Sequence, residues 1–192
     1  QRQMCIRDSY THGQIKLAGG VKMSSRKGNF VTANDILEAA RQANQYGDES
    51  ISLAAVKYAF SKQRIGGDII YDPAESVSLH GNSGPYLQYA FARASSILNK
   101  PKIQNPKSKT QNPKLEPAER TLLRKIGEYA EVVERAAAEL MPHHICTYLY
   151  ELAQTFNRFY EQNRVIDDPR EAVRIQLVSN YADTLKKGLE LL

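Results

Sequence analysis

The second half of the chain consists of amphipathic segments that must pack against one another to bury their apolar sides. Residues 122–140, 145–160 and 173–189 place apolar side chains at i, i+3, i+4 and i+7, the spacing of one helix face. Residues 86–98 repeat this pattern, and together these segments predict a helical bundle around a shared core. Residues 99–117 are rich in Pro, Lys, Gln and Asn, so we expect a solvated loop there.

The first half of the chain contains shorter elements that are separated by turns. Residues 13–17 alternate weakly and predict a strand, and residues 68–72 form a second extended segment. The tetrapeptide 32–35 has the hydroxyl and the carboxylate of a capping box, which predicts the start of a helix. A second helix is expected over residues 51–63. We place a domain boundary in the turn of residues 81–85.

Composition and charge narrow the class of protein. The chain has 192 residues, of which 42% are hydrophobic, enough for one globular domain or two small ones. Its net charge of +5 permits an RNA partner without requiring one. No apolar run approaches the roughly 18–20 residues needed to cross a bilayer. Cys5 and Cys146 form no CxxC pair, so we expect neither a disulfide framework nor a zinc site, but a reducing, cytoplasmic setting.

Residues 22–29 form the segment that best indicates chemistry. They place three cations, two hydroxyls and a glycine within eight residues, after the expected strand and before the capped helix. Lysines, hydroxyls and backbone amides bind phosphate oxygens, and glycine lets the backbone come close. The segment is therefore suited to holding a polyphosphate while negative charge moves through it. The alternative is an exposed basic loop without a function.

The same segment, KMSSRKGN, resembles the second signature loop of class I aminoacyl-tRNA synthetases, usually written KMSKS, in the form found in arginine-specific members. The resemblance implies that Lys22, and less firmly Lys27, stabilise the pyrophosphate that leaves ATP. Ser25 stands where KMSKS has its second lysine, which leaves open the cation that replaces it. The residues implied to bind ATP are Lys22, Met23, Ser24, Ser25, Arg26, Lys27 and Gly28.

A second resemblance lies at the start of the bundle. Residues 81–93, GNSGPYLQYAFAR, are similar to the GNTGPYLQYAHAR segment that opens the DALR anticodon-binding domain of arginyl-tRNA synthetases. Tyr86, Tyr89 and Arg93 share a helix face, where rings and a guanidinium can stack on and bond unpaired bases. A core stripe of tyrosines is the alternative. The residues expected to bind tRNA are Tyr86, Gln88, Tyr89, Arg93, Asn157 and Arg158, whereas Phe156, Phe159 and Tyr160 are expected in the core.

Histidine chemistry is not indicated. His80, His143 and His144 have no cysteine or carboxylate at ligand spacing, so we expect hydrogen-bonded structural histidines and no metal site.

The resemblance to arginyl-tRNA synthetases covers nearly everything after Ser9, and residues 1–9 are expected to be foreign to the protein. It implies a mostly α-helical chain: residues 1–83 as the end of a Rossmann-type α/β catalytic domain, then residues 84–192 as an all-α anticodon-binding bundle. The implied protein is a monomeric, cytoplasmic arginine–tRNA ligase that uses ATP and Mg²⁺ to join arginine to tRNA(Arg).

Two other functions are consistent with the sequence: another class I synthetase, such as the cysteine-specific type, and a non-catalytic RNA-binding module. The first class I signature (HIGH) does not occur in the chain. We therefore expect these 192 residues alone to be inactive as a ligase.

Overall fold

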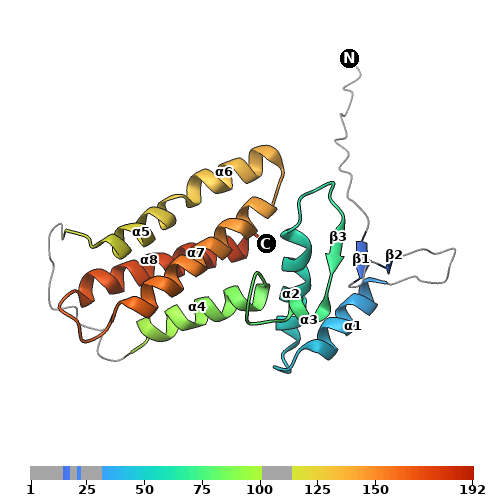
Figure 1. Cartoon of the computed structure of the whole chain (residues 1–192), viewed down its shortest axis with the longest axis horizontal. Helices are drawn as coiled ribbons and strands as arrows, with labels where there is room; N and C mark the ends of the chain where they lie inside the picture. The colour runs from blue at the N-terminus through green and yellow to red at the C-terminus, as the bar shows by residue number, and fades with distance from the viewer. Residues whose placement is uncertain (1–14, 18–20, 23–31, 101–113) are drawn as a thin grey trace, which may run out of the picture.

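The computed structural model describes residues 15–17, 21–22, 32–100 and 114–192. Figure 1 shows a small α/β part beside a bundle of long helices. The α/β part contains β1 (Ile15–Leu17), β2 (Val21–Lys22), α1 (Ala33–Ala43), α2 (Glu49–Ser61), β3 (Ile69–Tyr71) and α3 (Pro73–Ser76). The bundle contains α4 (Gly84–Leu98), α5 (Pro117–Gly127), α6 (Tyr129–Glu139), α7 (His143–Gln162) and α8 (Glu171–Glu190).

The sheet has the strand order β2-β1-β3. β1 pairs with β2 in antiparallel fashion and with β3 in parallel, with Ile15 opposite Ile69. Because parallel neighbours need a crossover, α1 and α2 connect β1 to β3 as in a βαβ unit. Both predicted extended segments are confirmed as strands of three residues.

The capping box predicted for α1 is present. The Thr32 hydroxyl accepts from the Asp35 backbone N–H at 3.2 Å, and the Asp35 carboxylate accepts from the Thr32 N–H at 2.7 Å. Two donors that a helix start leaves without partners are thereby satisfied. The predicted turn at residues 81–85 also starts a helix, since Ser83 is the N-cap of α4 and accepts from the Tyr86 N–H.

The bundle core forms where the apolar faces of α4, α5, α7 and α8 meet. Each large apolar side chain buried there contributes about 1.5–3 kcal/mol relative to exposure. The rings of Phe156 and Tyr181 stack at its centre, with centroids 3.9 Å apart. The fully buried members of this core include Leu87, Leu122, Leu149, Leu152, Phe156, Val178, Tyr181 and Leu185.

One sequence-based expectation is wrong. The single helix expected over residues 122–140 is two helices, α5 and α6, with Glu128 between them. Gly127 is a weak helix former, which favours a break at this point. A side chain of α7, Tyr148, also stabilises the break. The Tyr148 hydroxyl donates to the Lys125 carbonyl oxygen at 2.9 Å, an acceptor that a continuous helix would have used itself. Lys125 also binds the carboxylates of Glu128 and Glu151 at 2.8 and 2.6 Å.

Candidate nucleic-acid interface

The signature segment lies mostly outside the described residues. Lys22 belongs to β2 by its main chain, and residues 23–28 are not described. The part of the chain that follows is the capped start of α1. The roles of Lys22, Lys27 and their neighbours therefore stay predictions.

Asn157 on α7 joins two side chains of α4. Its amide nitrogen donates to the Tyr86 hydroxyl oxygen at 2.8 Å, and its amide oxygen accepts from Arg93 Nη1 at 2.8 Å. The Tyr86 ring also meets the Tyr150 ring edge-on, with centroids 5.6 Å apart. Burial raises the pKa of Tyr86, so its hydroxyl keeps its proton at neutral pH. The amide thus fixes the direction in which Arg93 leaves the helix.

Arg93 lies between two exposed tyrosine rings. Its guanidinium carbon is 5.0 Å from the ring centroid of Tyr89 and 6.0 Å from that of Tyr160, within cation–π range. Tyr89 is 47% exposed and Tyr160 is 37% exposed. Within the described ranges, no carboxylate lies at ion-pair distance from Arg93. The charge is therefore held in place without being neutralised. We call Tyr89, Arg93 and Tyr160 the tyrosine–arginine face.

The tyrosine–arginine face rests on the bundle core. The Tyr160 ring is nearly parallel to that of Phe156, with centroids 6.1 Å apart, and Phe156 stacks on Tyr181 in turn. Beside Tyr160, an open cleft of about 490 Å³ extends to Lys100 at the end of α4. Its other wall is the segment after α7, which includes Asn163 and Arg164. The cleft therefore places the Tyr160 ring and the cations of Lys100 and Arg164 together, with the carboxylates of Glu161 and Asp167 also in its lining.

Comparison with known proteins identifies the family of the bundle. The DALR anticodon binding domain matches residues 87–192, more than half of the chain. The chain belongs to the DALR anticodon-binding family. Its DALR domain carries the tyrosine–arginine face on α4 and α7.

Relatives and solved structures extend the match beyond the DALR domain. The chain is 34% identical to an arginine–tRNA ligase of Flavobacterium psychrophilum, covering 95% of this chain and 33% of the relative. It is 34% identical to one of Cutibacterium acnes, covering 94% and 34%. The structure of Thermus thermophilus arginyl-tRNA synthetase matches with a TM-score of 0.77 and 29% identity, covering 94% of this chain and 33% of that one. The chain thus spans about a third of these relatives, and the resemblance and fold class are confirmed.

Not all residues expected to bind RNA meet at the tyrosine–arginine face of the DALR domain. Tyr86 and Asn157 lie behind it as supports. Gln88 lies on another side of α4, near Lys57 of α2. Arg158 is exposed beside Thr121 of α5. Neighbouring residues in a helix point about 100° apart, which separates Gln88 from Tyr89 and Arg158 from Asn157.

Tyr160 is the member that sequence reasoning missed. Its spacing of four from Phe156 indicated the core, and Phe156 and Phe159 are indeed buried. Tyr160 instead lines the cleft and is 37% exposed. An aromatic residue in the last turn of a helix, next to a polar run such as 161–164, is the signal that could have identified it.

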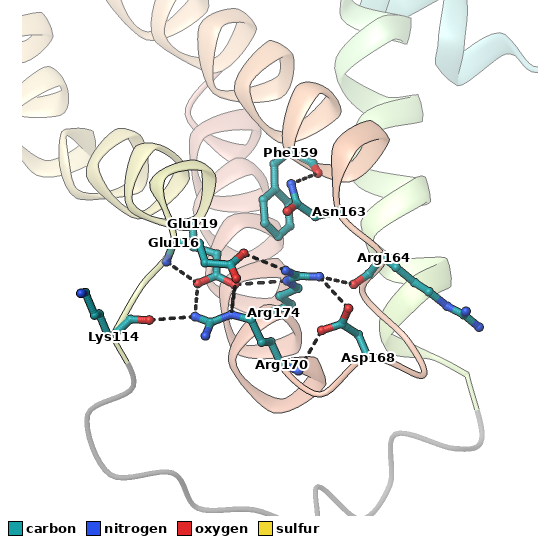
Figure 2. Close-up of polar contacts among 9 residues, drawn as sticks. All are labelled: Lys114, Glu116, Glu119, Phe159, Asn163, Arg164, Asp168, Arg170 and Arg174. Atoms are coloured by element: carbon teal, nitrogen blue, oxygen red, sulfur yellow. Dashed lines mark hydrogen bonds and ion pairs between the residues drawn. The ribbon is translucent and has the colours of Figure 1, made fainter.

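A buried ion network holds the far wall of the cleft (Figure 2). Glu119 on α5 is fully buried, and its carboxylate binds Arg170 and Arg174 near the start of α8. Arg174 Nη1 donates to the Arg164 carbonyl oxygen at 2.6 Å and pairs with Asp168 at 3.2 Å. The Arg170 guanidinium, above all, lowers the pKa of Glu119 to about 2 against the effect of burial. We call Glu119, Arg170 and Arg174 the buried ion network.

Metal and thiol chemistry have no support in the described part. No three His, Cys, Asp or Glu side chains gather there in a way that could hold a metal ion. His144 Nε2 lies 2.6 Å from a Glu139 carboxylate oxygen, and His143 Nδ1 is buried without a partner among the described residues. Burial raises the pKa of Cys146 to about 12, so its thiol is protonated. None of the described helices has the length and apolar character required to cross a membrane.

Proposed function

We propose that this chain is the part of a cytoplasmic, monomeric arginine–tRNA ligase that binds the anticodon loop and closes a signature loop on ATP. Residues 84–192 would bind tRNA(Arg), and residues 1–83 would belong to the catalytic domain, with residues 1–9 foreign to it. The observation that carries the proposal is Arg93 held between the rings of Tyr89 and Tyr160 in a DALR domain.

The tyrosine–arginine face has the chemistry that unpaired RNA requires. Bases of the anticodon loop stack on the exposed rings of Tyr89 and Tyr160, and each such stack contributes roughly 1–3 kcal/mol. The guanidinium of Arg93 presents fork-like donors to a base edge or a phosphate. The cleft beside Tyr160 offers space for a base that leaves the stack. Asn157 prevents the guanidinium from turning away before the RNA arrives.

Changing Arg93 to lysine tests this part of the proposal. We expect the affinity for an anticodon stem-loop of tRNA(Arg) to fall about tenfold or more, because an ammonium neither stacks nor binds in a fork. Filter binding at fixed ionic strength measures the loss. Arg124→Lys is the matched control, an exposed arginine on α5 away from the face, and should bind normally. Equal affinities of the Arg93 and Arg124 variants for the stem-loop would show that the tyrosine–arginine face does not bind the RNA.

ATP would be bound by the signature segment. Its three cations and two hydroxyls fit the phosphates of ATP, not a metal ion, which requires anionic or neutral donors. Mg²⁺ would therefore come to the protein with the phosphates and neutralise part of their charge. Lys22 and Lys27 would hold the departing pyrophosphate. Met23, Ser24, Ser25, Arg26 and Gly28 would complete the ATP-binding segment, with hydroxyl donors from the serines and added charge from Arg26. The positions of reacting groups, more than covalent chemistry, would set the rate.

The chain by itself should not join arginine to tRNA. It matches only about a third of the relatives' length, so about two thirds of their length has no counterpart in these 192 residues. We expect no arginyl-tRNA above background when the 192-residue chain is incubated with arginine, ATP, Mg²⁺ and tRNA(Arg). Formation of acid-precipitable arginyl-tRNA measures this. Product above background would contradict the assignment of the chain as a partial enzyme.

A further inference from the structure

The start of α4 meets α2 backbone to backbone. A Cβ atom on Gly84 would lie 2.9 Å from the Ala54 carbonyl oxygen and 3.1 Å from Tyr58 Cβ. Contacts below 3.0 Å do not occur in packed interiors, and the atom in the way belongs to the main chain of a helix. A side chain at this position therefore requires α2 and α4 to move apart.

The turn before Gly84 is also bound to α2 and α7. The Tyr58 hydroxyl lies 2.6 Å from the Asn82 side-chain oxygen and 3.0 Å from the Cys146 carbonyl oxygen. Burial raises the pKa of Tyr58, so its proton stays available for these acceptors. Lys62, at the end of α2, donates to the Asn82 carbonyl oxygen at 3.0 Å. We call Tyr58, Asn82 and Gly84 the α2–α4 joint.

Gly84 of the joint and Tyr89 and Arg93 of the tyrosine–arginine face lie on one continuous helix, α4. Arg93 follows Gly84 by nine residues in α4, a distance of about 14 Å at 1.5 Å per residue. No break in the helix can absorb a change of direction between them. Because the apolar side of α4 is buried in one core with α7 and α8, a displacement at Gly84 moves the bundle as a unit and carries the tyrosine–arginine face with it.

We propose that the α2–α4 joint sets the position of the tyrosine–arginine face relative to the N-terminal part of the chain. Tyr58, Asn82 and Gly84 are then positioning residues for the transfer of arginine. This inference rests on the proposed function, in which one end of the tRNA is bound by the bundle while the other end reacts. An error in the direction of α4 displaces the reacting end, and a misplacement of about 1 Å can lower a rate about 100-fold.

The test uses Gly84→Ala in the ligase that contains this chain, with Gly127→Ala as the matched control. Gly127 is also a helical glycine, but a Cβ atom there meets nothing within 4 Å. For Gly84→Ala we expect the Kd for the anticodon stem-loop to stay within twofold of wild type, while kcat of aminoacylation falls at least tenfold. Gly127→Ala should leave both values unchanged.

The outcomes separate the joint from the face. An unchanged kcat in folded Gly84→Ala protein overturns the inference, and so does a parallel loss of stem-loop affinity and kcat, which indicates general damage. If circular dichroism shows that Gly84→Ala is unfolded, the inference is tested with Tyr58→Phe instead. This variant removes only the hydroxyl that contacts Asn82 and Cys146. It should lower kcat at least threefold with stem-loop affinity retained, and an unchanged kcat overturns the inference. A wild-type protein that does not bind the stem-loop overturns the proposed function instead, together with all that rests on it.

Discussion

Replacing Glu119 by alanine lowers the free energy of unfolding by about 2–3 kcal/mol, because buried donors of Arg170 and Arg174 lose their acceptor while Glu116 and Asp168 keep both charges paired. The change removes the carboxylate that lies 3.1 Å from Arg174 Nε and an acceptor of Arg170, while Glu116 and Asp168 stay paired with Arg174 at 3.0 and 3.2 Å. It also weakens the anchoring of Arg174, whose Nη1 donates to the Arg164 carbonyl oxygen in the cleft wall. Urea unfolding followed by circular dichroism measures the loss. Glu134→Gln, an exposed change on α6, is the control and should stay within about 0.5 kcal/mol of wild type.

Glu119 also makes the free energy of unfolding depend on pH in the acid range. The pKa of Glu119 is about 2 in the folded chain against an ordinary value of 4.5. Because it is lowered on folding, its stabilisation is complete above pH 4.5 and is lost as the pH falls towards 2, by about 3 kcal/mol in all. Glu119→Gln should show a shallower loss between these pH values. Parallel curves for the variant and the wild type would contradict the role of Glu119.

Replacing Lys22 by alanine in the ligase that contains this chain slows formation of arginyl-adenylate on the order of 100-fold or more. One donor placed on developing charge contributes on the order of 3–4 kcal/mol to the barrier, and the proposed role of Lys22 is of that kind. Rapid quench with radiolabelled ATP, in the presence of tRNA(Arg), measures the step directly. Lys27→Ala, tested beside it, identifies which cation takes the place of the second KMSKS lysine.

Lys187→Ala serves as the control for the lysine variants, since it removes an exposed charge on α8 far along the chain. Its adenylate rate should equal that of wild type. An unchanged rate in the Lys22 variant would show that Lys22 does not act in the mechanism. The assignment of residues 22–29 as the ATP-binding segment would then lose its main support.

Local rules predicted most of the helices. The hydroxyl and carboxylate of Thr32 and Asp35 were enough to place the start of α1, because a capping box depends only on residues three apart. The apolar spacing in α7 and α8 predicted which sides are buried, since a core face of a bundle is continuous. The α5–α6 break depends on a hydroxyl from α7, more than 20 residues away, and no local pattern reports it.

The candidate site was predicted only in part for the same reason. Tyr89 and Arg93 stand four residues apart in one helix, so their contact follows from spacing alone, whereas Tyr86 lies behind them as a support. Asn157 binds the Arg93 guanidinium and Tyr160 lies on its second side, and both contacts depend on how α7 packs on α4. The buried ion network joins residues about 50 positions apart. Its one visible signal is Arg174, which stands three residues before Leu177 on the apolar face of α8, where a charge requires a partner.

The α2–α4 joint has a consequence for protein engineering. A recombinant bundle excised at Gly84 would leave behind Tyr58 and Lys62, and with them every contact that α2 makes to the turn before the first helix. Grafting such a bundle onto a foreign synthetase would also require a helix whose main chain can approach the glycine as closely as that of α2 does. The natural unit of exchange is therefore the bundle together with α2, and its cut lies upstream of Asp48, where α2 begins.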